Sequence, residues 1–278
     1  MSVLALTAFL LIGSALAGLV GALTGLGGGV LLVPMLVLLF HVDVHYAVGA
    51  SLISVIATSS GASAAYLREG YTNLRIATFL LVATVGGALL GAFLAEHLHG
   101  RIIAIIFGFV LIFSAYLSFR RQEVQDENRP SSLLAMRLGM EGSLPTVEGW
   151  QPYPVYNVMG GFSLMLVAGT LSGLLGIGSG AVKVLAMDQV MRLPYKVSTT
   201  TSNFMIGVTA AASAGVYFSH GFIDPGLTMP VMIGVFLGAV VGAKFLMVAK
   251  TELLRIFFSL IVFLLAVEMI YSGLTGKI

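Results

Sequence analysis

Long stretches of the chain carry no charged residue, and this pattern sets its fold class. Asp, Glu, Lys and Arg are all absent from residues 2–42, 46–67, 76–95, 102–119 and 151–182. A helix needs about 20 mainly apolar residues to cross a bilayer, whereas the strands of a membrane β-barrel alternate polar and apolar residues. The pattern therefore predicts an all-α polytopic membrane protein.

Ten hydrophobic segments follow one another along the chain, five in each half. They span residues 3–24, 29–40, 46–67, 75–96 and 101–119, and then 155–175, 180–191, 197–219, 226–248 and 253–273. The second segment of each half has about 12 residues, or about 18 Å of helix, which is too short for a hydrocarbon core of about 30 Å. We expect each of these two segments to be a broken helix that starts from a glycine-rich turn inside the membrane.

The two halves repeat one another. A shift of 151 residues lays residues 18–119 over 169–270 without a gap and places Ser51 on Ser202. A single register for many matches indicates an internal repeat. We therefore expect three parts, which are a first transmembrane repeat (1–119), a cytoplasmic linker (120–150) and a second transmembrane repeat (151–278).

The distribution of basic residues predicts the topology. If all ten segments cross the membrane, the linker side holds Arg68, Arg75, Arg120, Arg121, Arg129, Arg137, Arg192, Lys196, Lys250 and Arg255. The other side then holds only Arg101 and Lys277, whereas the split is seven against five if the short segments do not change sides. Basic residues concentrate on the cytoplasmic side, so the first count is favoured. It places the linker inside, both termini outside and the two repeats inverted, as in many secondary transporters.

The overall composition narrows the chemistry. Hydrophobic residues make up 58% of the 278 residues and charged residues 9%, against about 25% charged residues in a soluble domain. The chain has no cysteine, which excludes disulfides, thiolate metal sites and cysteine nucleophiles. The chain has a net charge of only +2 and contains no nucleotide-binding loop. We therefore expect no cofactor, no metal site and no nucleic-acid partner.

Two glycine-rich clusters are the first candidates for a binding site. Their candidate residues are Gly27, Gly28, Gly29, Gly178, Ser179 and Gly180. Each cluster precedes a short segment, and a helix that starts inside the membrane directs backbone N–H groups and the positive end of its dipole at a ligand. That geometry favours a small anion. The alternative is that these glycines serve close packing between helices.

Polar side chains follow at matching positions in the third segment of each half. They are Ser51 and Ser54 in the first half and Thr201, Ser202 and Asn203 in the second. Hydroxyl and amide groups can donate hydrogen bonds to an oxyanion. They can equally bond the carbonyls of their own helices, so both interpretations stay open.

Lys183 is the strongest single candidate. It precedes Arg192 by nine residues, about 13 Å of helix, so it is expected near the bilayer midplane if Arg192 marks the cytoplasmic interface. A lysine at that depth costs roughly 2.5–3.5 kcal/mol, which a bound anion would offset. Asp188 lies about 140° around the helix from Lys183 and is expected to pair with Arg192. A carbonyl or carboxylate from another helix is the alternative partner of Lys183.

The five histidines all fall in loops on the expected outer side. They are His41, His45, His97, His99 and His220. Close pairs among them could bind a metal or sense pH, but we expect ordinary interfacial residues.

Five strings of residues carry a family resemblance. They are GLGGG (25–29), AVGASL (47–52), GIGSG (176–180), KVLAMD (183–188) and KVSTTTSNFM (196–205). Together they resemble the TauE/SafE family of sulfite-exporter-like membrane proteins, over nearly the whole chain apart from the linker. The resemblance implies transport of sulfite, an organosulfonate or a related small anion, without identifying which one.

We therefore expect a secondary transporter, and more specifically an exporter, of a small sulfur-containing oxyanion in a bacterial plasma (inner) membrane. Its inverted repeats would alternate access to a central site. The expected partners are the anion and the lipid bilayer, while a homo-oligomer and a proton or sodium coupling ion stay open. An intramembrane enzyme or assembly factor is one alternative, but no catalytic motif is present. A metal-cation carrier is another, but it would need an internal cluster of Asp, Glu or His.

Overall fold

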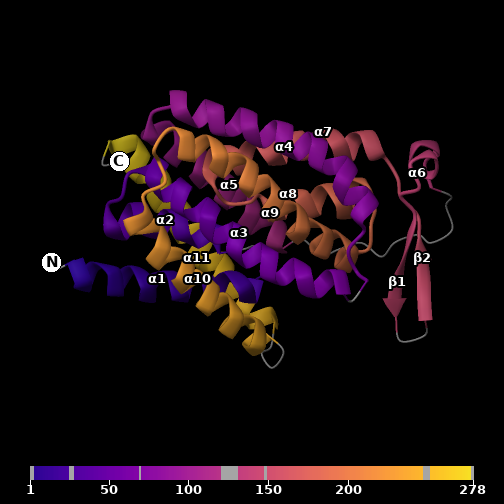
Figure 1. Cartoon of the computed structure of the whole chain (residues 1–278), viewed down its shortest axis with the longest axis horizontal. Coiled ribbons are helices and arrows are strands. Elements are labelled where there is room, and N and C mark those ends of the chain that lie inside the picture. Colours follow the sequence, from indigo (N-terminus) through magenta and orange to yellow (C-terminus); the bar gives the residue numbers. More distant parts are fainter. Residues whose placement is uncertain are drawn as a thin grey trace.

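The computed structural model describes residues 3–24, 28–68, 70–119, 131–146, 149–246 and 251–276, which form α-helices almost throughout (Figure 1). The first half contains α1 (Val3–Thr24), α2 (Gly29–Phe40), α3 (Val44–Arg68), α4 (Leu74–His97) and α5 (Gly100–Phe119). The second half contains α7 (Val158–Leu175), α8 (Gly180–Leu185), the π-helical turn η1 (Ala186–Val190), α9 (Tyr195–Ser219), α10 (Pro225–Leu246) and α11 (Thr251–Thr275). These helices coincide with the predicted hydrophobic segments to within a few residues.

Several helices are suited to a bilayer by length and composition. Within the described residues, three qualify as full spans, over Val44–Gly61, Leu74–His97 and Val158–Leu175. Shorter apolar runs of 10–17 residues occur in α1, α2, α5, α10 and α11. Backbone groups in a bilayer must be paired internally, which helices achieve. The helical prediction is therefore confirmed.

Each long helix packs against a helix from the other half of the chain. The main pairs are α1 with α10, α4 with α7, α5 with α11 and α3 with α9. A Cβ atom at Gly87 of α4 would collide with the carbonyl oxygen of Leu166, and one at Gly238 of α10 with that of Ala15. These two contacts are related by the 151-residue shift. Glycines thus bring the α4–α7 and α1–α10 backbones into equally close contact.

The helices α3 and α9 run in opposite directions. Gly49, near the start of α3, packs against the backbone of Phe222, which follows α9. At the other end, the Thr200 hydroxyl near the start of α9 donates to the carbonyl of Tyr71, which follows α3 (3.0 Å). The helices α5 and α11 are also antiparallel, because Gly273 near the end of α11 lies against the start of α5.

Both termini lie at one end of the molecule, and a small folded unit lies at the opposite end (Figure 1). The unit consists of α6 (Leu133–Arg137) and an antiparallel hairpin of β1 (Gly142–Thr146) and β2 (Gly149–Tyr153). The sequence did not predict this hairpin. The described part of the expected linker therefore has its own secondary structure.

Asn73 attaches the hairpin unit to α4. Its side chain accepts a hydrogen bond from the Ile76 amide (3.1 Å), which caps the helix, and donates to Met140 O and Tyr153 Oη (2.9 Å each). Burial raises the pKa of Tyr153, and the hydrogen bond from Asn73 partly opposes this. The phenol therefore stays neutral at physiological pH, and the attachment does not depend on an ionised group.

Candidate functional site

A tight turn joins α7 to α8. Gly176 and Gly178 have φ angles of 69° and 70°, which glycine adopts without steric cost. Ser179 follows with a φ of 47°, an uncommon conformation for a residue with a side chain and one that clusters at functional sites. The turn allows α8 to begin at the buried Gly180 rather than at the protein surface.

Lys183 projects from α8 and is fully buried, with 0% of its surface exposed. Its ammonium group donates a hydrogen bond to the Thr209 hydroxyl of α9 (3.0 Å), and this hydroxyl donates in turn to Met205 O (2.5 Å). Within the described chain, no carboxylate forms an ion pair with Lys183. An ammonium has three N–H donors, so the single neutral hydroxyl leaves most of its capacity unused.

Ser179 lies one helical turn before Lys183, and the Lys183 amide bonds to its carbonyl (3.1 Å). Its side chain is 3% exposed, and its hydroxyl has no hydrogen-bond partner among the described residues. Long side chains on a helix lean towards its N-terminus, so the Lys183 stem is directed to the end of α8 that carries Ser179. Lys183 and the buried, unpartnered Ser179 hydroxyl thus belong to residues one helical turn apart.

The two glycine-rich clusters meet across the interface between the halves. A Cβ at Gly29, the first residue of α2, would approach Gly176 O to 3.1 Å and Ser51 Oγ to 2.9 Å. The Ser51 hydroxyl itself donates to Gly176 O (2.8 Å). The equivalent Ser202 makes a longer contact with Gly180 O (3.4 Å). Ser51 and Ser202 thus contact the backbone of the glycine-rich turn.

The other candidate residues have local roles or lie farther along the helices. Ser54 donates to Ala50 O of its own helix (2.9 Å), and Thr201 accepts from the Asn73 amide (3.1 Å). Asn203 is half-buried. Gly28 precedes α2 and packs towards α10, whereas Gly27 lies outside the described residues.

Two features differ from the expectations. Asp188 and Arg192 do not form an ion pair in the described structure, because η1 has π-helical geometry and Arg192 is left-handed (φ 55°). These features replace the regular helical spacing on which that prediction relied.

Thr209, the hydrogen-bond partner of Lys183, was also missed as a site residue. Its alignment with Thr58 in the repeat was the available signal.

Apolar helices packed through glycine contacts, with a buried lysine and buried hydroxyls between them, define an integral membrane protein with a polar centre. The chain belongs to the sulfite exporter TauE/SafE family, whose model matches residues 10–269.

Curated relatives extend over nearly the same length. The chain is 25% identical over 269 residues to the probable membrane transporter protein YunE of Bacillus subtilis (strain 168), covering 93% of this chain and 95% of that protein. It is 28% identical over 231 residues to the probable membrane transporter protein YdhB of the same organism, covering 83% and 86%. No solved structure matches the chain. The family and these relatives identify a membrane transporter.

Proposed function

We propose that this protein is a secondary transporter that exports a small sulfur-containing oxyanion, such as sulfite or an organosulfonate. The observation that carries the proposal is the fully buried Lys183, bonded to one neutral hydroxyl and to no carboxylate in the described chain. Burial of an uncompensated charge is costly, and an anion would offset that cost. The family description supports both the sulfur oxyanion and the outward direction.

The chemistry of the site suits an oxyanion. Thr209 occupies one Lys183 donor, which leaves two of the three ammonium N–H groups for ligand oxygens. The Ser179 hydroxyl is buried without a partner and can donate a further hydrogen bond. Bonds from an ammonium to a charged oxygen are about twice as strong as neutral ones. A metal cation would instead be repelled by the ammonium.

The proposal includes ten crossing segments in two inverted repeats. Equivalent helices of oppositely oriented repeats run antiparallel, as α3 with α9 and α5 with α11 do. Repeats of the same orientation would have placed these partners parallel. The shared end of the two termini and the opposite position of the hairpin unit also support this topology (Figure 1). Together with the distribution of basic residues, they favour a cytoplasmic hairpin unit in a bacterial plasma membrane.

The test compares the native protein with Lys183→Met, Lys183→Arg and the matched control Leu32→Met. Leu32 is fully buried at the equivalent position of the first repeat, and an exchange of Leu for Met conserves volume. Sulfite or taurine should raise the Tm of the native and Leu32→Met proteins and move across proteoliposomes containing them. Lys183→Met should lose both effects, while Lys183→Arg keeps part of the binding. A folded Lys183→Met protein that transports sulfite at the native rate would show that the proposal is wrong.

A further inference from the structure

The two ends of the α3–α9 pair are closed by equivalent contacts. At the end that holds the termini, the His45 ring stacks on Phe222, with ring centroids 5.0 Å apart and planes at 25°. At the hairpin end, the Lys196 ammonium lies 5.6 Å from the centroid of the Tyr71 ring. The 151-residue shift relates His45 to Lys196 and Tyr71 to Phe222. In each contact, the first turn of one repeat's helix meets the loop of the other repeat.

Backbone contacts reinforce both closures at equivalent positions. Gly49 packs against the carbonyl of Phe222, and Thr200, 151 residues later, donates its hydroxyl to the carbonyl of Tyr71 (3.0 Å). Cross-repeat contacts of this kind separate only if the two helices move apart at that end. The fully buried Lys183 bonds to the middle of α9, between the two ends that these contacts join.

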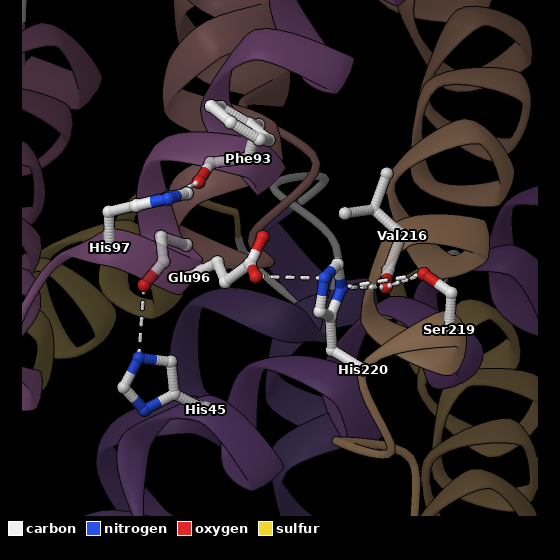
Figure 2. A network of polar contacts seen from close by, with 8 residues as sticks. His45, Phe93, Glu96, His97, Val216, Ser219 and His220 are labelled. Atoms are coloured by element: carbon white, nitrogen blue, oxygen red, sulfur yellow. Dashed lines mark hydrogen bonds and ion pairs between the residues drawn. The ribbon is translucent and has the colours of Figure 1, made fainter.

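The end with the termini also carries a polar network that joins three helices (Figure 2). The His220 Nε2 lies 2.9 Å from a Glu96 carboxylate oxygen, which connects the end of α9 to the end of α4. The His45 Nε2 contacts Ala95 O of α4 at 3.0 Å, and its Nδ1 contacts Asp43 at 3.0 Å. No histidine takes part in the Lys196–Tyr71 contact at the opposite end.

In both histidines, each ring nitrogen lies near a hydrogen-bond acceptor. Each His45 nitrogen faces an oxygen that only accepts hydrogen bonds. The His220 Nε2 faces Glu96, whereas its Nδ1 lies 2.8 Å from Val216 O and 3.4 Å from the Ser219 hydroxyl, which can also donate to it. A neutral imidazole has one N–H and satisfies one such acceptor, whereas the imidazolium satisfies both. Protonation would therefore satisfy more of the acceptors around each ring in the closed arrangement.

Other titratable or charged groups occur on the elements at this end. They are His41, Tyr46, His97, His99, Arg101, Tyr217 and Asp224. Tyr46 and Tyr217 contact Phe222 edge-on, His97 bonds to Phe93 O in its own helix, and Asp224 accepts from the Leu227 amide. Within the described residues, Asp43 and Glu96 are the carboxylates that contact His45 and His220, respectively.

We propose that the His45–Phe222 and Lys196–Tyr71 contacts are the outer and inner gates of the transporter, and that protonation of His45 and His220 holds the outer gate closed. This inference rests on the proposed transport function, because a gate requires alternating access to a central site. The protonated rings satisfy more of the surrounding acceptors than the neutral rings do, so the interactions that favour closure weaken when the histidines deprotonate. Opening to the outside should therefore become easier as the external pH rises.

The test measures access to the interior rather than transport. The chain has no cysteine, so Ser213→Cys is a single reporter in α9, seven residues before His220 and 0% exposed. An external, membrane-impermeant maleimide is applied at pH 5.5 and pH 8, and rates are normalised to the exposed Thr275→Cys protein, which removes the intrinsic thiol effect. We expect relative labelling to be about threefold to fivefold faster at pH 8, the scale of a partly exposed ion pair.

Three variants at the outer gate provide the decisive comparison. Glu96→Gln and His220→Gln should each speed labelling at pH 5.5 and reduce its pH dependence, while Phe222→Ala should speed labelling at both pH values. An unchanged ratio between the two pH values in both Gln variants would overturn the histidine mechanism.

The inner gate has a separate reporter. Ser202 is 1% exposed, and a Ser202→Cys reporter should react with maleimide from the hairpin side faster when it is combined with Tyr71→Ala. Equal rates would overturn the inner gate.

The gating test is independent of the substrate. Lys183→Met should leave the pH dependence of Ser213→Cys labelling unchanged. Loss of anion binding with intact gating would therefore count against the proposed substrate alone, whereas intact binding without pH-dependent labelling would count against the gate alone.

Discussion

Replacement of Lys183 by methionine should stabilise the protein when no anion is present. A lysine near the bilayer midplane costs roughly 2.5–3.5 kcal/mol, and its hydrogen bond to Thr209 (3.0 Å) returns about 1.5–3 kcal/mol. The difference runs from about −0.5 to about 2 kcal/mol, so lysine carries a net cost over most of this range. Methionine fills a similar space without a charge, so Lys183→Met should unfold at a Tm several degrees above that of the native protein.

Addition of the anion should reverse this order. A ligand at 100 times its Kd stabilises the protein that binds it by about 2.7 kcal/mol. The native protein should gain this increment and Lys183→Met should not. The native protein is then the more stable of the two at saturating sulfite, and the two plots of Tm against sulfite concentration cross.

Thermal unfolding in detergent measures both effects. The buffer should be Tris chloride, since common buffers such as HEPES are themselves sulfonates and would occupy the site. Thr209→Val removes the lysine's hydrogen bond, so it should destabilise the native background more than the Lys183→Met background in a double-mutant cycle. The threshold for refutation is a destabilisation of about 2 kcal/mol, which approaches the loss caused by breaking a buried pair. If Lys183→Met is destabilised by this amount or more without anion and still responds to sulfite, the argument from an uncompensated charge is wrong.

Other substitutions test the fold. Gly87→Ala should destabilise the protein by about 1–3 kcal/mol, since its Cβ would collide with the α7 backbone. The control Gly86→Ala, whose Cβ meets nothing within 4 Å, should be neutral or stabilising by about 0.5–1 kcal/mol. Asn73→Ala should lower stability by about 2 kcal/mol through the lost cap and two lost hydrogen bonds; an unchanged Tm would contradict its role in attaching the hairpin unit. Cysteines at Gln125 and Gly276 should label from opposite sides of the membrane, and labelling from one side would contradict the inverted topology.

The sequence predicted the positions of the long helices because their boundaries are local. Runs of apolar residues end at charged, glycine or capping residues, such as Asn73 before α4, whose side chain accepts from the Ile76 amide. The start of α8 was predictable for the same reason, since Gly176 and Gly178 allow the left-handed turn before it. Burial of Lys183 also followed from its place within an apolar segment.

Features that depend on distant contacts or on backbone detail were not predictable in this way. Thr209 is 26 residues from Lys183, and only packing of α8 on α9 brings them together. The hairpin contains Pro145 and Pro152, residues that weaken a strand signal. The expected pair of Asp188 with Arg192 failed because sequence spacing alone does not reveal a π-helical turn.

The pairing of every long helix with one from the other half is the geometry of an isologous homodimer, in which one surface contacts its own copy. A half-length ancestor with this interface would have assembled as two identical chains. Such a dimer can carry a buried lysine twice or not at all. In one chain the two positions differ independently, so Lys183 occupies one while the apolar Leu32 occupies the other. A single covalent chain therefore permits one buried charge where a dimer of identical chains would carry two or none.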